Sequence, residues 1–425
     1  MYEKSSQKFD IELFKTPSAE YRGAPFWAWN DKLENDELCR QIDEFKKMGF
    51  GGFNMHPRQG LVTPYLEDEF MDAIKTCVQR AKETGTYAWL YDEDRFPSGF
   101  AGGIVTADPE LRIKMLTFST EKIKDVFENK AFSEYVIGGY DKTPSEVVKS
   151  KTGYKLGKPY LLAVFDVVLS DDGIMTEYSP IDYKDDAKGI KVYAYVQTLP
   201  CLQGWNNTNI ADLMQEKAVD KFIECTYQKY YDVVGEDFGG AIPAIFTDEP
   251  QVVPKRPLSN ARGEVDTHFS WTTDFPLTFK MQKGYDLVPL LPELVWDKKT
   301  PSKARYDYFD HQAEKLKTTY ADKIGKWCKR HGILFSGHYA QEDSLKSQSE
   351  WIGEAMRLYD AMDVPGLDLL ANRNGYIAGK QVISSARQSG KNTILSELYG
   401  VTGWDFDFRG HKYQGDCVCI ISSSY

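Results

Sequence analysis

The stretch Ala241-Ile242-Pro243-Ala244-Ile245-Phe246-Thr247-Asp248-Glu249-Pro250 predicts a buried β-strand that ends in two carboxylates. Its first half is apolar and β-branched, as a strand covered on both faces requires. Asp248 and Glu249 follow abruptly, and Pro250 cannot continue a hydrogen-bonded ladder. Strands of this kind are typical of α/β barrel enzymes, whose chemistry collects at the C-terminal rim. In isolation an Asp-Glu-Pro turn is more often a solvated strand end, so the functional interpretation depends on the rest of the chain.

A unit of helix, glycine, strand and polar turn recurs along the chain. Residues 34–48 carry apolar side chains at helical spacing, Gly49 ends that helix, and 50–55 follows as a strand. Later copies span 67–91 and 316–336. This rhythm predicts an α/β fold, a (β/α)8 TIM-type barrel. The eight candidate strands lie at 25–29, 50–55, 86–91, 242–247, 333–337, 367–370, 392–396 and 417–422.

One region breaks this rhythm and predicts an insertion. Residues 160–168 and 190–196 alternate between apolar and polar side chains, and the turn formers 138–139 and 171–173 separate such runs. We expect an antiparallel β-rich insertion between barrel strands 3 and 4, which would either help to bind substrate or serve as a lid or packing module. The predicted division is 1–111 for the first part of the barrel, 112–205 for the insertion and 206–425 for the second part.

Composition limits the partners of this 425-residue chain. Its net charge of −11 argues against nucleic acid or an anionic membrane as the main partner. No apolar run approaches the ~20 residues that a membrane-spanning helix needs. The N-terminus lacks the apolar core of a signal peptide, and the seven cysteines are scattered without a CxxC motif. These features predict a cytoplasmic protein, and an exported homologue without its leader stays an alternative.

Three glutamates that follow apolar strands are the candidate catalytic residues. They are Glu249, Glu342 and Glu397. Glycoside hydrolysis needs two carboxyl groups beside the scissile bond, one protonated as an acid and one ionised. A barrel rim can bring carboxylates from distant positions within several Å of one another. Each glutamate alone is more often a solvated acid or an ion-pair partner, but three at strand ends favour a carbohydrate-active enzyme.

Other side chains at strand ends are candidate ligands for sugar or metal. His56 and Arg58 could hydrogen-bond sugar hydroxyls, although His56 alone would more often be structural. Asp92, Glu93 and Asp94 form a hard-oxygen cluster that suits Ca²⁺, with a plain charged turn as the alternative. His338 is the best single histidine candidate. The aromatic residues that could stack on sugar rings, of which about half should be core, are Trp27, Trp29, Tyr91, Tyr399 and Trp404.

Missing motifs narrow the class of enzyme. The sequence holds no HExxH or HxH pair, which disfavours a zinc hydrolase. It also holds no GxSxG elbow, the usual signal of a serine hydrolase, and no GxGxxG or Walker loop. A nucleotide-binding doubly wound fold is therefore disfavoured as well.

An ordered set of motifs resembles glycoside hydrolase family 106, the α-L-rhamnosidase family. Its N-terminal block, Pro25-Phe26-Trp27-Ala28-Trp29-Asn30, is followed by His56-Pro57-Arg58-Gln59-Gly60-Leu61. Thr247-Asp248-Glu249-Pro250 and Ser396-Glu397-Leu398-Tyr399-Gly400 complete the set towards the C-terminus. Further matching stretches lie at 49–53, 63–66, 89–94, 97–99, 337–338, 342–345 and 365–368.

The resemblance implies a (β/α)8 barrel that hydrolyses a terminal α-L-rhamnosyl or related deoxy-sugar bond, with inversion and with a bound Ca²⁺. By position, Glu249 resembles the general acid and Glu397 the general base, with Glu342 as its rival or as a ligand. The implied metal ligands are Glu342 and Glu93. The implied contacts to the carbohydrate substrate are Trp29, His56, Arg58, Tyr91, Asp92, Asp248, His338, Tyr399 and Trp404.

The C-terminus departs from this family pattern. Family members continue into β-rich domains, whereas this chain stops near the predicted eighth strand, which predicts a truncated form. An inactive, carbohydrate-binding barrel of the same family is therefore the alternative function. A metal-dependent sugar isomerase, built from Asp, Glu and His at the rim, is a third.

Overall fold

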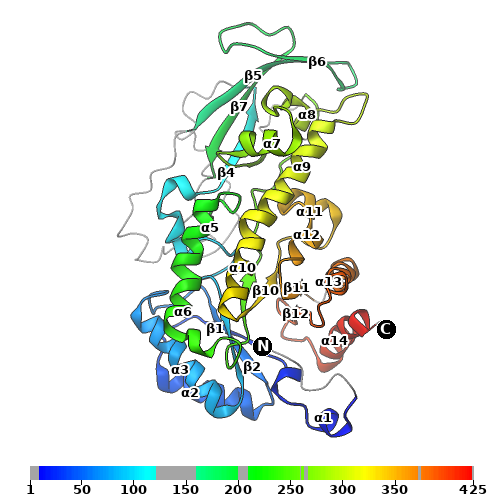
Figure 1. Cartoon of the computed structure of the whole chain (residues 1–425). Helices are drawn as coiled ribbons and strands as arrows, with labels where there is room; N and C mark the ends of the chain where they lie inside the picture. Colours follow the sequence, from blue (N-terminus) through cyan, green and yellow to red (C-terminus); the bar gives the residue numbers. More distant parts are fainter. Residues whose placement is uncertain are drawn as a thin grey trace.

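A parallel sheet forms one part of the computed structural model, which describes residues 9–120, 159–199, 209–258, 260–262, 267–371 and 375–423. Its strands follow sequence order, and each pairs in parallel with the next (Figure 1). This is the order that repeated βα units produce. The strands are β1 (Phe26–Trp29), β2 (Gly52–Pro57), β3 (Tyr87–Tyr91), β8 (Ala244–Asp248), β10 (Leu334–His338), β11 (Val364–Leu369) and β12 (Leu395–Leu398).

The prediction of a closed eight-stranded barrel is wrong. Over the described residues the parallel sheet has seven strands and two open edges, at β1 and β12. The expected eighth strand at 417–422 belongs to helix α14 (Phe408–Ser423). The run Cys417-Val418-Cys419-Ile420-Ile421 is too short for its apolar character to separate a strand from a helix. The other seven predicted strands are confirmed within a few residues.

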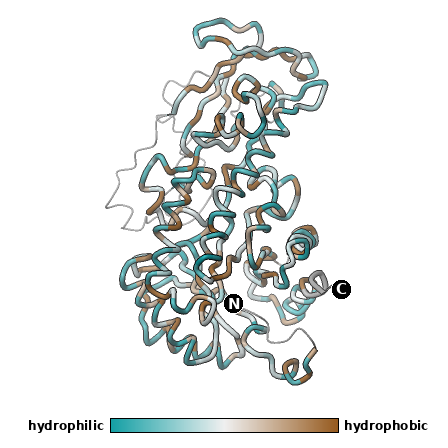
Figure 2. The backbone as a smooth tube through the Cα atoms, in the orientation of Figure 1, coloured by the Kyte–Doolittle hydropathy of each residue, from teal (hydrophilic) through white to brown (hydrophobic). Residues whose placement is uncertain are grey.

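Helices connect the parallel strands and carry one apolar face each. In α3 (Asp68–Thr84) the buried side chains include Phe70, Ile74, Cys77 and Ala81, which recur at helical spacing. Gly85 ends this helix in the left-handed conformation, as predicted. The helices mix hydrophilic and hydrophobic residues along their length (Figure 2). None of those in the described part of the chain has the length and hydrophobicity to cross a membrane.

The helices, in chain order, have the following bounds. The N-terminal part holds α1 (Ile11–Lys15), α2 (Asn35–Lys47) and α3. The middle holds α5 (Glu216–Phe222), α6 (Lys229–Val234), α7 (Phe275–Lys283), α8 (Pro292–Val295), α9 (Lys303–Leu316) and α10 (Asp322–His331). The C-terminal part holds α11 (Leu345–Trp351), α12 (Ala355–Tyr359), α13 (Tyr376–Gln388) and α14.

An antiparallel sheet lies beyond one end of the parallel sheet (Figure 1). Its order is β6 (Met175–Pro180), β5 (Tyr160–Leu169), β7 (Ile190–Thr198), β4 (Lys114–Ser119) and β9 (Thr267–Trp271). The alternating runs at 160–168 and 190–196 thus form strands, with 171–173 in the turn that follows the first. The turn predicted at 138–139 lies outside the described residues. Strand β9, which follows β8 in sequence, was not predicted.

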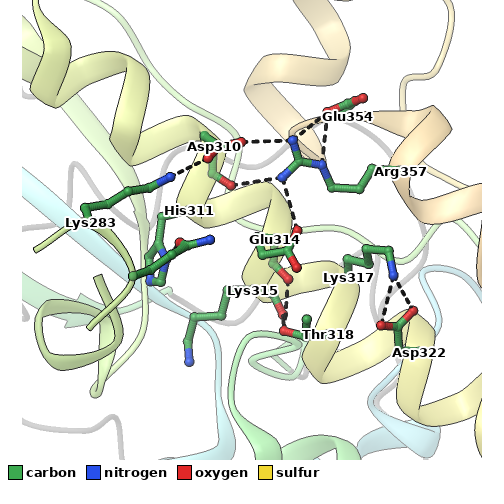
Figure 3. Close-up of polar contacts among 11 residues, drawn as sticks. Lys283, Asp310, His311, Glu314, Lys315, Lys317, Thr318, Asp322, Glu354 and Arg357 are labelled. Atoms are coloured by element: carbon green, nitrogen blue, oxygen red, sulfur yellow. Dashed lines mark hydrogen bonds and ion pairs between the residues drawn. The ribbon is translucent and has the colours of Figure 1, made fainter. Parts of the chain in front are cut away.

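A long helical segment joins the two sheets. It runs through α9, a π-helical turn at Lys317–Ala321 and α10. The Tyr308 hydroxyl donates to the Ser270 carbonyl in β9, and the Tyr320 hydroxyl lies 2.6 Å from Thr247 Oγ1 in β8. On another side, Arg357 of α12 forms ion pairs with Asp310 and Glu314 of α9 (Figure 3). These contacts fix the parallel strands relative to the antiparallel sheet.

Candidate active site

Polar side chains gather where the parallel strands end, which we call the carboxyl edge. In the β8–β10 pair, Asp248 is in register with His338, and in the β11–β12 pair, Asp368 is in register with Glu397. Neighbouring parallel strands in register present their last residues on the same side of the sheet, so these four side chains converge. Ligands of open α/β sheets bind at this edge.

The end of β8 is held by its neighbours. The Tyr91 hydroxyl donates to Asp248 Oδ2 over 2.5 Å, and the Asp248 amide donates to Ser98 Oγ over 2.7 Å. Glu249 has a positive φ of 48°, and its amide donates to the His338 carbonyl over 3.2 Å. A non-glycine residue in the left-handed region costs about 1–3 kcal/mol and is a feature of functional sites. The chain thus turns sharply at Glu249 instead of extending the strand.

Gly337 allows β10 to approach β8 closely. Its φ is +136°, and a Cβ atom added there would lie 2.0 Å from the Thr247 carbonyl oxygen. Only glycine satisfies both conditions. The residue that follows, His338, is therefore brought directly beside Asp248.

His338 joins two carboxylates at the carboxyl edge. Its Nε2 lies 2.8 Å from Glu397 Oε2 and 3.6 Å from Asp248 Oδ1, and the residue is 1% exposed. Within the described ranges these three residues are the group whose ligand atoms are close enough together, within 4.8 Å, to hold a metal ion. The shortest separation is that of a direct hydrogen bond, so the arrangement also works as a hydrogen-bonded triad without an ion.

Burial and crowding shift the pKa values of these acids. Burial, with Asp248 nearby, raises the pKa of Glu249 to about 8. Burial raises the pKa of Glu397 above its ordinary value, although the hydrogen bond and charge of His338 act in the opposite direction. Burial alone would lower the pKa of His338, but the Glu397 hydrogen bond and the surrounding carboxylates raise it well above its ordinary value. These surroundings favour the protonated form of Glu249 and the cationic form of His338.

Glu342 is a buried hydrogen-bond acceptor. Its Oε1 accepts from the Asp368 amide over 2.7 Å, and its Oε2 accepts from the Tyr359 hydroxyl. The residue is 3% exposed, and burial raises its pKa to about 7. It therefore helps to fix the end of β11.

Glu93 anchors the loop that follows β3. Its two oxygens accept hydrogen bonds from the backbone amides of Asp94, Gly99, Phe100, Ala101 and Gly102. No contact in the described part of the chain joins Glu93 to Glu342, the two residues predicted as metal ligands. A calcium ion at either carboxylate would compete with the donors already there, so no step of the reaction below is assigned to a metal.

The other residues predicted to bind substrate differ in their exposure to solvent. Asp92 is fully buried and accepts from the hydroxyls of Ser98 and Tyr227. The His56 ring is buried, with its centroid 4.0 Å from that of Tyr91, and burial lowers its pKa well below the ordinary value. Arg58 is partly exposed, and its charge lowers the pKa values of Asp248 and Glu397. Of these residues, Arg58 offers the most accessible polar group.

The predicted aromatic platforms do not share one environment. Trp29 is 2% exposed, and its ring packs edge-on against Phe70, which makes it part of the core. Tyr399 is exposed and its ring lies beside His411, whereas Trp404 is fully exposed. The described contacts do not bring any of the three to the His338 triad.

Several residues of the site were not singled out from the sequence. Asp368 is the penultimate residue of β11, near the same edge of the sheet as Asp248 at the end of β8, so its position in an apolar strand was a usable signal. Tyr227 and Tyr359 come from helical segments and reach Asp92 and Glu342 from the side. No local pattern distinguishes these tyrosines from ordinary core residues.

The fold is similar to that of a known rhamnosidase. The structure of the rhamnosidase from Novosphingobium sp. PP1Y aligns with a TM-score of 0.60 and 14% sequence identity, over 96% of this chain. The aligned part is 55% of that enzyme, so the present chain spans about half of its length. No protein-family model and no curated protein sequence matches the chain. At this level of identity the similarity establishes a shared fold.

Proposed function

We propose that the chain is a glycoside hydrolase that removes terminal α-L-rhamnosyl or related deoxy-sugar residues. The observation that carries the proposal is the pairing of Glu249, a partly buried carboxyl whose pKa is raised to about 8, with the Glu397 carboxylate at the same edge of the sheet. Two carboxyl groups in different environments are what glycoside hydrolysis uses. The similarity of the fold to a rhamnosidase supports the choice of sugar.

In the proposed reaction, Glu249 is the general acid and Glu397 the general base. Glu249 gives its proton to the glycosidic oxygen as the bond from that oxygen to the anomeric carbon breaks. A water molecule attacks the anomeric carbon from the opposite face, and its proton passes to Glu397. Inversion needs carboxyl groups roughly 6.5–9.5 Å apart, which leaves room for the water. NMR of the first anomer released distinguishes inversion from retention.

Glu397 is favoured over Glu342 as the base. The Glu397 side chain is 17% exposed, whereas Glu342 is 3% exposed and both of its oxygens already accept hydrogen bonds. A base must reach a water molecule, so the more accessible carboxylate suits this role.

The decisive experiment is Glu249→Gln with an aryl α-L-rhamnoside as substrate. General acid catalysis contributes about 10²–10⁴-fold, so kcat should fall by that factor. Glu44→Gln, on the outer side of α2, is the matched control and should keep the wild-type rate. Activity of Glu249→Gln within a few-fold of wild type would sink the assignment. Sugar binding by calorimetry without any turnover in the wild type would favour a carbohydrate-binding protein instead.

A further inference from the structure

His338 is surrounded by carboxylates from every strand that packs against it. Its Nε2 is within hydrogen-bonding distance of Glu397, and Asp248 Oδ1 lies 3.6 Å away on the other side. Tyr91 fixes Asp248 by donating to its second oxygen. The charged groups that act on this centre are Asp248 and Glu249 from β8, Glu342 beyond β10, Asp368 from β11, Glu397 from β12 and Arg58 beyond β2.

Burial excludes a direct role for His338 in binding sugar. The side chain is 1% exposed, and its Nε2 is already directed at Glu397. The ring also packs against Phe246 of β8 in a T-shaped arrangement, with the centroids 5.4 Å apart. A role through its neighbours therefore suits this buried side chain better than the predicted contact with substrate.

We propose that His338 is a positioning residue, a buried imidazolium that orients Glu397 and keeps it ionised so that it can accept a proton from water. The proposal rests on the proposed function for the role of Glu397. Within the described part of the chain no hydrogen bond joins the His338 ring to the Glu249 carboxyl, on which burial and the charges of Asp248 and His338 act. His338 thereby separates the two carboxyl groups, one held as a base and the other left as an acid.

The first test is the protonation state of the His338 ring in the full chain. Long-range ¹H–¹⁵N NMR should show both ring nitrogens still protonated above the pH at which an ordinary histidine becomes neutral. His338→Gln assigns the signal, because it alone should disappear. Asp248→Asn removes one acidic neighbour and should lower the pH at which the ring loses its second proton. A neutral ring near neutral pH, or a stoichiometric metal ion found by elemental analysis, would overturn the proposal.

The second test follows the consequence for Glu397. A positive charge nearby lowers the pKa of a carboxyl group by about 1–3 units. His338→Gln can keep a hydrogen-bond donor near Glu397 but removes this charge. The ¹³C carboxyl titration of Glu397 should therefore move up by at least about 1 unit. The acidic limb of the kcat/KM profile should move with it, and kcat should fall more than KM changes. His331→Gln on α10 is the control and should leave both unchanged.

The two proposals can fail separately. If no rhamnoside is cleaved, the proposed function fails, while the NMR titrations of His338 and Glu397 still test the positioning role. If rhamnosides are cleaved but His338→Gln leaves the Glu397 titration and the acidic limb in place, the positioning role is rejected and the hydrolase stands.

Discussion

The hydroxyl of Tyr91 donates a 2.5 Å hydrogen bond to Oδ2 of Asp248, although 157 positions separate the two residues in the chain. This bond joins β3 to β8 at the carboxyl edge, and the other oxygen of Asp248 faces His338. Burial raises the pKa of Asp248, while His338 and the Tyr91 hydrogen bond lower it. Tyr91 thus acts on the reactive centre through Asp248, from a fully buried position.

Tyr91→Phe should weaken both stability and catalysis. The substitution keeps the ring that lies against His56 and Phe246 but leaves a buried carboxylate oxygen without its donor. We expect a loss of about 1–3 kcal/mol in the free energy of unfolding. On the proposed function, kcat with an aryl α-L-rhamnoside should also fall, because Asp248 is then free to compete for His338. Urea unfolding and steady-state kinetics measure the two effects.

Tyr308→Phe is the matched control for Tyr91→Phe. Its hydroxyl also makes a buried hydrogen bond, to the Ser270 carbonyl in the antiparallel sheet. This variant should lose comparable stability with no change in kcat. If both variants change kcat equally, the effect of Tyr91 is one of general stability and the link to Asp248 is wrong.

The pKa of Glu249 predicts the alkaline limb of the activity profile. A general acid must be protonated, and burial with Asp248 nearby raises the pKa of Glu249 to about 8. Activity should therefore persist at neutral pH and fall as the pH rises through about 8. A pH profile of kcat/KM with an aryl rhamnoside measures this limb. A limb that falls near the ordinary glutamate value would contradict the environment described for Glu249.

The same shift predicts how stability depends on pH. Because the pKa of Glu249 is raised from 4.5 to about 8, the folded state binds the proton more tightly than the unfolded state. This contribution to stability is complete below the unfolded value and is lost as the pH rises through the folded value. The side chain of Gln does not titrate, so the stability of Glu249→Gln relative to wild type should increase between pH 4.5 and about 8. Urea unfolding at several pH values gives the difference, and a constant difference would reject the shift.

The sequence predicted most of the parallel sheet because its strands are buried on both faces. Runs such as Ala244–Asp248 are apolar, β-branched and closed by polar turns, which gives a strong local signal. The failure came at 417–422, where a similar apolar run lies in helix α14. A short run of this kind is decided by tertiary contacts, which no local pattern contains. The closed barrel was inferred from this eighth run and failed with it.

The site was predictable in part for the same reason. Asp248, His338 and Glu397 all follow apolar runs, and parallel pairing brings strand ends together. The depth of each side chain was not predictable. Trp29 ends β1 and Tyr91 ends β3, two strands of similar composition, yet Trp29 packs against Phe70 in the core and Tyr91 donates to Asp248. Which face a strand-end side chain takes depends on its register and on helices distant in sequence.

Glu93→Gln should be strongly destabilising. The carboxylate of Glu93 accepts five backbone N–H groups of the loop that follows β3. An amide side chain replaces one acceptor oxygen with a donor, which would face these N–H groups. We expect a loss of about 2–4 kcal/mol in the free energy of unfolding. Glu83→Gln, near the exposed end of α3, should cost far less. Equal losses in the two variants would show that the loop does not depend on Glu93.

Calcium binding is a prediction from the family resemblance, and the melting temperature can test it. The test distinguishes a bound ion at Glu93 and Glu342 from the hydrogen bonds that these residues make without one. A ligand that binds only the folded state stabilises it by about 2.7 kcal/mol at a hundred times its dissociation constant. If Ca²⁺ binds, EDTA should lower the melting temperature and the rate with an aryl α-L-rhamnoside that the proposed function predicts. Ca²⁺ should restore both while Mg²⁺ does not, since Mg²⁺ demands a smaller octahedral site. The hydrogen bonds of Glu342 to Tyr359 and Asp368 need no ion. If these bonds are the whole role of Glu342, EDTA should change neither the melting temperature nor the rate. Unchanged melting temperature and rate after EDTA treatment would therefore reject calcium and leave Glu93 and Glu342 with their structural roles.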